Sequence, residues 1–198
     1  MKESTIVLVR RFRRALFFAT ALATCAMHRP ALAGIVYLNR CVAGCTVSAG
    51  PDDAANHVSS ILTSNSTAPE FAYSDATFDQ VAACVHHVLL PFDIHVVITD
   101  PGLAPRREIM LTTTSQTLGF PPGLAENSPY TGNSMENTIA FVFATTLAGN
   151  VDKICESAAH DIGILYGLEY VTNWPDIMAT NVSSPRIREA MTRANSPK

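Results

Sequence analysis

Residues 74–92 repeat their hydrophobic side chains with the period of an α-helix. The apolar positions recur at spacings of three and four and so share one helix face: Phe78, Val81, Ala82, Val85 and Leu89. Ser74 or Asp75 can cap the start of this helix, and Pro91 ends it because proline cannot continue the hydrogen-bonding pattern. The pattern therefore predicts a long amphipathic helix in this segment.

A second helix is predicted for residues 150–167. Asn150 or Asp152 can cap its start, and Gly167 stands where a glycine commonly ends a helix. Its apolar residues also recur at helical spacing. One face of this helix is therefore expected to pack on a sheet, and we expect the acidic side chain of Asp161 to lie on its exposed face.

Four further segments are rich in β-branched and aromatic residues and predict strands: residues 34–39, 93–100, 108–114 and 137–146. Residues 41–62, in which Gly, Pro, Asp and Ser mark turns, predict a loop, and so do residues 115–137, which are rich in Gly, Pro, Ser and Asn. The resulting order is strand, helix, strand, strand, strand, helix. It predicts an α/β (α+β) domain of two layers, with both helices on one face of a mixed, twisted sheet.

The first 33 residues have the pattern of a secretory signal peptide. A cluster of arginines is followed by a short apolar run and by small residues at 31–33, ahead of Gly34. The apolar run is too short to span a membrane. The sequence thus predicts a secreted or periplasmic domain of residues 34–198, with a lipid anchor at Cys25 as the less favoured alternative.

The composition of residues 34–198 limits the classes of partner that the domain is expected to bind and indicates an oxidising environment. Eight Lys and Arg residues stand against sixteen Asp and Glu residues, a formal net charge of −8, which argues against binding to nucleic acid or anionic lipid. Four cysteines remain, Cys41, Cys45, Cys84 and Cys155, and in an exported chain they predict two disulfides. Three pairings are possible, and we favour Cys41–Cys45 with Cys84–Cys155.

The segment "HDIGILYGLEY", residues 160–170, resembles the H-E-x-x-H-x-x-G-x-x-H helix of the metzincin zinc peptidases. His160 stands at the first metal ligand, Asp161 at the catalytic glutamate, Gly167 at the glycine and Tyr170 at the third ligand. In such a helix, histidines four residues apart point at one metal ion, and the glycine lets the chain turn back. Ile164 occupies the position of the second histidine.

Met178 follows this segment where the family has its Met-turn, a turn that carries a methionine beneath the metal site. The predicted order of strands and helices also matches a metzincin catalytic domain. The resemblance therefore implies a metzincin-like fold for residues 34–198. It also relates the chain to a family whose members use zinc to hydrolyse peptides.

The departures from the motif imply that this chemistry is degenerate. Isoleucine has no lone pair to give to a metal, tyrosine replaces imidazole poorly, and the aspartate side chain is one methylene shorter than glutamate. We therefore expect no cofactor, with zinc bound at His160 and Tyr170 only if the site still works. His160 is more simply explained as a partly buried histidine with a hydrogen-bond partner, in which case Glu156, one turn earlier, would pair with it.

The sequence leads to three hypotheses about function. The first is an exported, non-catalytic pseudo-peptidase that binds a peptide or protein. The second is an active zinc endopeptidase with unorthodox ligands, in which Asp161 is the general base and Glu156 or Tyr170 helps His160 to bind the metal. The third is a disulfide-stabilised secreted domain of unrelated function.

Overall fold

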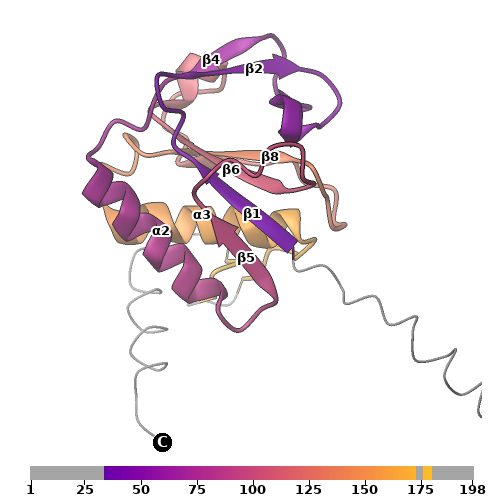
Figure 1. Ribbon diagram of the computed structural model, residues 1–198, viewed down its shortest axis with the longest axis vertical. Helices are drawn as coiled ribbons and strands as arrows, with labels where there is room; N and C mark the ends of the chain where they lie inside the picture. Colours follow the sequence, from indigo (N-terminus) through magenta and orange to yellow (C-terminus); the bar gives the residue numbers. More distant parts are fainter. Residues whose placement is uncertain (1–33, 173–175, 180–198) are drawn as a thin grey trace, which may run out of the picture. The chain divides into compact units, whose positions relative to one another are not determined.

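A five-stranded sheet lies at the centre of the computed structural model, which describes residues 34–172 and 176–179 (Figure 1). Its first four strands run parallel and the last runs antiparallel to its neighbour. Their order across the sheet is β5 (Ile94–Val97), β1 (Gly34–Asn39), β6 (Arg107–Thr112), β8 (Ile139–Phe143) and β7 (Glu126–Asn127). The prediction of a mixed sheet is confirmed, although β5 and β8 are shorter than the sequence pattern suggested.

Two helices, α2 (Asp75–Leu89) and α3 (Val151–Leu165), pack together on one face of this sheet (Figure 1). The Ser74 side chain accepts a hydrogen bond from the Thr77 amide, and the Asn150 side chain accepts one from the Lys153 amide. Such caps satisfy backbone N–H groups that a helix leaves unpaired. The α+β class and the placement of both helices on one face agree with the sequence prediction.

The other face of the large sheet is covered by a second sheet, which the sequence did not predict. It consists of β3 (Val58–Ser59), β2 (Cys45–Ala49) and β4 (Ser66–Ala68), with short 3-10 helices η2 (Ala54–Asn56) and η3 (Ser115–Leu118) nearby. Met110, Phe141 and Phe143 are fully buried in the core between the two sheets. The prediction of a loop at 41–62 was therefore wrong, because strands of two to five residues show too little alternation to be recognised.

Two disulfides connect the elements in the favoured pairing. Cys84 and Cys155 join α2 to α3 with their Cα atoms 6.0 Å apart, and Cys41 and Cys45 close a tight loop before β2. Both bonds belong to the buried cores. The prediction of two disulfides in this pairing is confirmed.

The contacts between residues divide the chain between Ala33 and Gly34. This is the boundary that the sequence predicts for the end of the signal peptide, and cleavage there stays a prediction. No helix among residues 34–172 and 176–179 is long and apolar enough to cross a membrane.

Candidate functional site

Helix α3, which carries the metzincin-like motif, is buried along its length from Ile154 to Leu165. The sheet and α2 cover one side of it. The short strand β7 and the segment after it cover another side, where the Met135 amide donates to the carbonyl of Leu165 over 2.8 Å. The two polar motif residues on α3, His160 and Asp161, are consequently held inside the protein and not on its surface.

His160 and Glu126 form the closest contact in this region. His160 Nδ1 lies 2.7 Å from Glu126 Oε1, and the side chains are 5% and 16% exposed, respectively. Neither ring nitrogen of His160 makes a hydrogen bond with a described residue, and Glu126 Oε2 is also buried without one. The predicted burial of His160 is confirmed, and its partner here comes from β7. Glu156, which the sequence favoured as that partner, is fully buried one turn earlier on α3.

Asp161 is only 1% exposed, so the expectation of an exposed acid was wrong. Burial raises the pKa of its carboxyl well above the ordinary value, the nearby charge of Glu126 raises it further, and a hydrogen bond with Ser128 lowers it. The physical reason for the error is that β7 and Ser128 pack over the side of α3 that a two-layer domain would leave in water. Two carboxyl groups and an imidazole therefore meet in one buried cluster, formed by Glu126, Asp161 and His160. One potential ligand atom from each of these residues lies within 4.8 Å of the other two.

Tyr170 lies beside this cluster, as the motif predicted. Its ring centroid is 5.5 Å from that of His160 and 5.4 Å from that of Tyr130. Burial raises the pKa of the Tyr170 hydroxyl, and the charges of Asp161 and Glu126 add to the rise. The two tyrosines are nonetheless about half exposed, at 46% and 49%, so they form the solvent-facing border of the cluster.

A three-histidine zinc site does not fit these residues. Ile164, at the second ligand position, is 1% exposed and has no atom that can bind a metal. His86 and His95 are exposed on α2 and β5, and the described residues place no second histidine in the cluster. The donors that do converge are one imidazole and two carboxyl groups.

Gly167 ends the motif helix in the way that the sequence predicted. It follows α3 with a φ of +83°, and a Cβ atom at this position would lie 2.7 Å from the backbone nitrogen of Ser134. Only glycine adopts this conformation without strain and leaves room for the neighbouring chain. The glycine thus lets residues 133–134 approach the end of α3.

Met178 lies in a turn at residues 176–179 and packs against α3. The amide of Val171 donates to the carbonyl of Met178 over 2.9 Å, which joins the turn to the chain that leaves the helix. Met178 is 4% exposed, and its sulfur occupies the space that a Cβ atom at Gly163 would need. Trp174 and Pro175, which the sequence suggested as a brace for this turn, lie outside the described residues.

The contact between Met178 and Gly163 can be tested by mutation. We expect Gly163→Ala to destabilise the protein by about 1 kcal/mol, because the added methyl group displaces Met178. In a Met178→Ala background the same change should be neutral or stabilising, because alanine has a helix propensity about 1 kcal/mol better than glycine. Urea denaturation of the four proteins of this double-mutant cycle measures the coupling. An equal effect in both backgrounds would show that Met178 does not contact α3 at this point.

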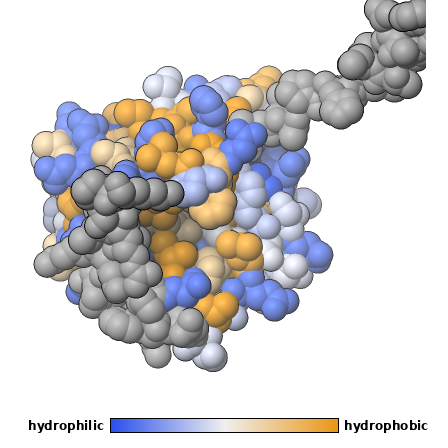
Figure 2. Space-filling view, turned by 90° about the horizontal axis from the view of Figure 1, so that it is seen from below, coloured by the Kyte–Doolittle hydropathy of each residue, from blue (hydrophilic) through white to orange (hydrophobic). Residues whose placement is uncertain are grey.

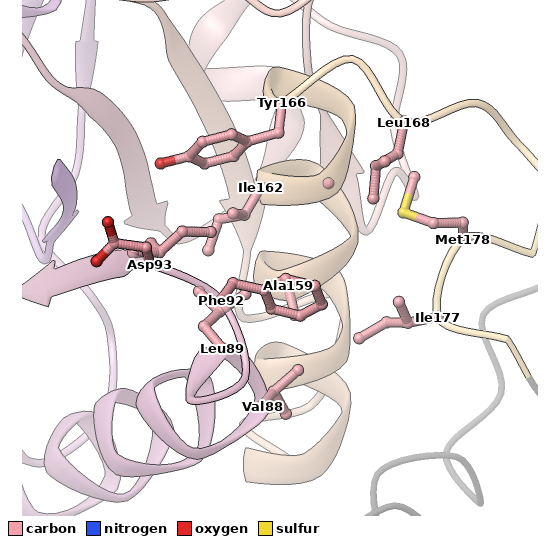
Figure 3. A pocket seen from close by; sticks show the side chains of 12 residues that line it. Val88, Leu89, Phe92, Asp93, Ala159, Ile162, Tyr166, Leu168, Ile177 and Met178 are labelled. Atoms are coloured by element: carbon pink, nitrogen blue, oxygen red, sulfur yellow. The ribbon is translucent and has the colours of Figure 1, made fainter. Parts of the chain in front are cut away.

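An apolar cavity of about 310 Å³ lies between the end of α2, helix α3 and the turn at Met178 (Figure 3). Among the described residues that line it, Asp93 carries the only charge, and Met178 extends toward α3 beside Leu168. Figure 2 shows hydrophobic residues gathered on the side where α2 and α3 lie in Figure 1. The cavity is separate from the polar cluster, because Ala159 and Ile162 of α3 line it and His160 and Asp161 do not.

Comparison with known proteins adds no assignment to this picture: no family model matches the chain, and no curated protein matches its sequence. The site therefore rests on its own geometry. Sequence reasoning identified His160, Asp161, Gly167, Tyr170 and Met178 but missed Glu126, which lies in a two-residue strand inside the loop predicted for 115–137. The only local sign of Glu126 in the sequence is an acidic residue within a long predicted loop, and such residues are common on protein surfaces.

Proposed function

We propose that this chain is an exported, metzincin-like protein that binds an extended peptide segment without cleaving it. The observation that carries the proposal is the position of β7. This strand forms the edge of the large sheet next to the cluster, and no strand of the described residues pairs with its outer side. Unpaired backbone groups at a sheet edge can bind an extended peptide as an additional strand.

The border of the cluster supplies side chains suited to recognition. Tyr130 is the third residue after the end of β7. Its ring contacts that of Tyr170, and both side chains remain about half exposed. Exposed tyrosines are frequent anchors in binding surfaces, because they bury a large apolar area and still offer a hydroxyl group. An edge strand that is followed by Tyr130, with Tyr170 packed against that tyrosine, therefore favours a peptide ligand over a small molecule.

Two features of the same site favour binding over hydrolysis. A catalytic zinc ion keeps one open position for water and substrate, whereas the nitrogens of His160 and the Oδ2 atom of Asp161 are buried. Ile164 further removes one of the three ligands that the motif requires. These observations support binding without cleavage. The predicted signal peptide and the two disulfides support export.

Screening a random peptide library against the purified residues 34–198 tests this proposal. Peptides selected for binding should remain intact by mass spectrometry after long incubation. Tyr130→Ala and Tyr170→Ala should each weaken binding by about tenfold, and N-methylation of alternate peptide amides should abolish it, because an added strand binds through its N–H groups. Leu103→Ala, at a position that is 82% exposed, is the matched control.

Two results would contradict the proposal. Chelator-sensitive cleavage of the selected peptides would show an active metallopeptidase in place of a binding protein. Binding that is equally strong in the tyrosine variants and in the Leu103 control would place the peptide elsewhere.

A further inference from the structure

The buried cluster of Glu126, His160 and Asp161 contains more polar atoms than its protein partners satisfy. His160 is 4% exposed and Asp161 is 1% exposed. Nε2 of His160, Oε2 of Glu126 and Oδ2 of Asp161 are buried without a hydrogen bond to a described residue, and Nδ1 of His160 has only its contact with Glu126 Oε1. Such groups are rare in folded proteins, because each buried polar atom left without a partner costs about 1–3 kcal/mol.

A second buried carboxylate in the same sheet provides the contrast. Glu108 is fully buried on β6, yet Asn39 donates to its Oε1 over 2.8 Å and Arg106 donates to its Oε2 over 3.1 Å. An arginine charge balances the carboxylate there. At Glu126 and Asp161 no arginine or lysine of the described residues forms an ion pair with either carboxylate.

We infer that Glu126, His160 and Asp161 together bind one divalent first-row transition-metal ion of the zinc type. The ion would accept a lone pair from the imidazole and from each carboxylate, and its two positive charges would balance the two acids. Imidazole favours such metals over calcium and magnesium. This donor set differs from the three-histidine site of the metzincin motif, because Glu126 comes from β7 and Ile164 contributes nothing.

The present spacing is close to what such an ion needs. In a tetrahedral site with bonds of about 2.1 Å, neighbouring donor atoms lie about 3.4 Å apart. In this cluster the donor atoms lie within 4.8 Å of one another, and the pair formed by His160 Nδ1 and Glu126 Oε1 is at 2.7 Å. Binding an ion therefore requires side-chain rotations that open the short contact by about 0.7 Å and close the longer ones by at most about 1.4 Å.

The burial of the donors assigns the ion a structural role. Three donors fill three of the four positions of a tetrahedral site. The second oxygen of either carboxylate, Oε2 of Glu126 or Oδ2 of Asp161, is also buried without a hydrogen bond to a described residue. If it fills the fourth position, no place is left at which a water molecule and a substrate carbonyl could react. The ion would instead join β7 to α3 and so brace the edge strand. The inference does not depend on the proposed peptide, because it concerns the metal and these three residues alone.

The experiment uses residues 34–198 freed of metal with a chelator, and zinc chloride as the probe. Isothermal titration calorimetry should show one site per chain, elemental analysis of the undialysed protein should find one equivalent of metal, and zinc should raise the melting temperature by several degrees. Glu126→Gln, His160→Ala and Asp161→Asn should each weaken zinc binding at least tenfold. His95→Ala, at an exposed histidine of β5, should bind as the wild type does.

The wild-type titration alone can overturn the inference, so a variant that fails to fold does not obscure the result. Absence of a one-to-one zinc site in the folded wild type would show that a shared proton or water satisfies the cluster. Zinc binding that persists in the three cluster variants but is lost in the His95 variant would place the ion at the surface. Peptide binding measured on the metal-free protein tests the proposed function separately.

Discussion

Replacing Cys84 and Cys155 with alanine should lower the free energy of unfolding by about 4 kcal/mol. The bond closes a loop with a sequence separation of 71 residues between α2 and α3. Without it the unfolded chain gains the conformational freedom of that loop, while the helices keep their other contacts. Urea denaturation of the double variant and of the wild type measures the difference.

The second disulfide provides a matched control. Cys41 and Cys45 are separated by 4 residues, so the same change at this pair should lower the free energy of unfolding by only about 2 kcal/mol. Mass spectrometry without reduction should find no free thiol in residues 34–198 of the wild type or of either variant. Equal losses for the two pairs would show that local strain, and not loop closure, determines what these bonds contribute.

Gly167→Ala should destabilise the protein by about 3 kcal/mol. Alanine at a φ of +83° is strained, and its Cβ atom would lie 2.7 Å from the backbone nitrogen of Ser134 and 2.8 Å from the carbonyl carbon of Asn133. Backbone atoms cannot rotate away as the end of a long side chain can. The segment before Met135 must therefore move from α3, and the melting temperature should fall by about 10 °C.

The variant Gly119→Ala separates backbone strain from steric overlap as causes of the lost stability. Gly119 has a nearly equal φ of +80°, but a Cβ atom there would meet nothing within 4 Å. This variant should lose about 1 kcal/mol from backbone strain alone. If both variants lose the same stability in thermal denaturation, the close approach of residues 133–134 to α3 does not contribute.

The elements that the sequence predicted well are those with long, regular patterns. Both helices repeat their apolar residues over four turns, and Ser74, Asn150 and Gly167 provide their ends. Four strands of the large sheet, β1, β5, β6 and β8, are rich in apolar and β-branched residues, whereas the two-residue strand β7 is not. In each case the information is local, since neighbouring residues alone determine which faces are apolar and where a helix can begin or end.

The candidate site was predicted only in part, because its partners come from distant parts of the chain. The motif placed His160, Asp161 and Tyr170 on and after one helix, and they do lie together. Nothing in the local pattern distinguishes Glu126 from an ordinary surface acid, and nothing shows that β7 covers Asp161. An acidic residue in a helix is usually exposed, so its burial could be learned only from what packs over it.

The sequence by itself determined the two helices, the main strands and the glycine that ends the motif helix, because each depends on residues close together in the chain. It left three pairings of the four cysteines open, and the packing of α2 on α3 brings Cys84 to Cys155. Only the tertiary structure decided that a second sheet covers the large one and that Glu126 meets His160 and Asp161 in a buried cluster. The physical reason is twofold. Strands of two to five residues are too short to show a hydrophobic pattern. The burial of a side chain depends on which distant segments pack against it, and the local sequence does not contain that information.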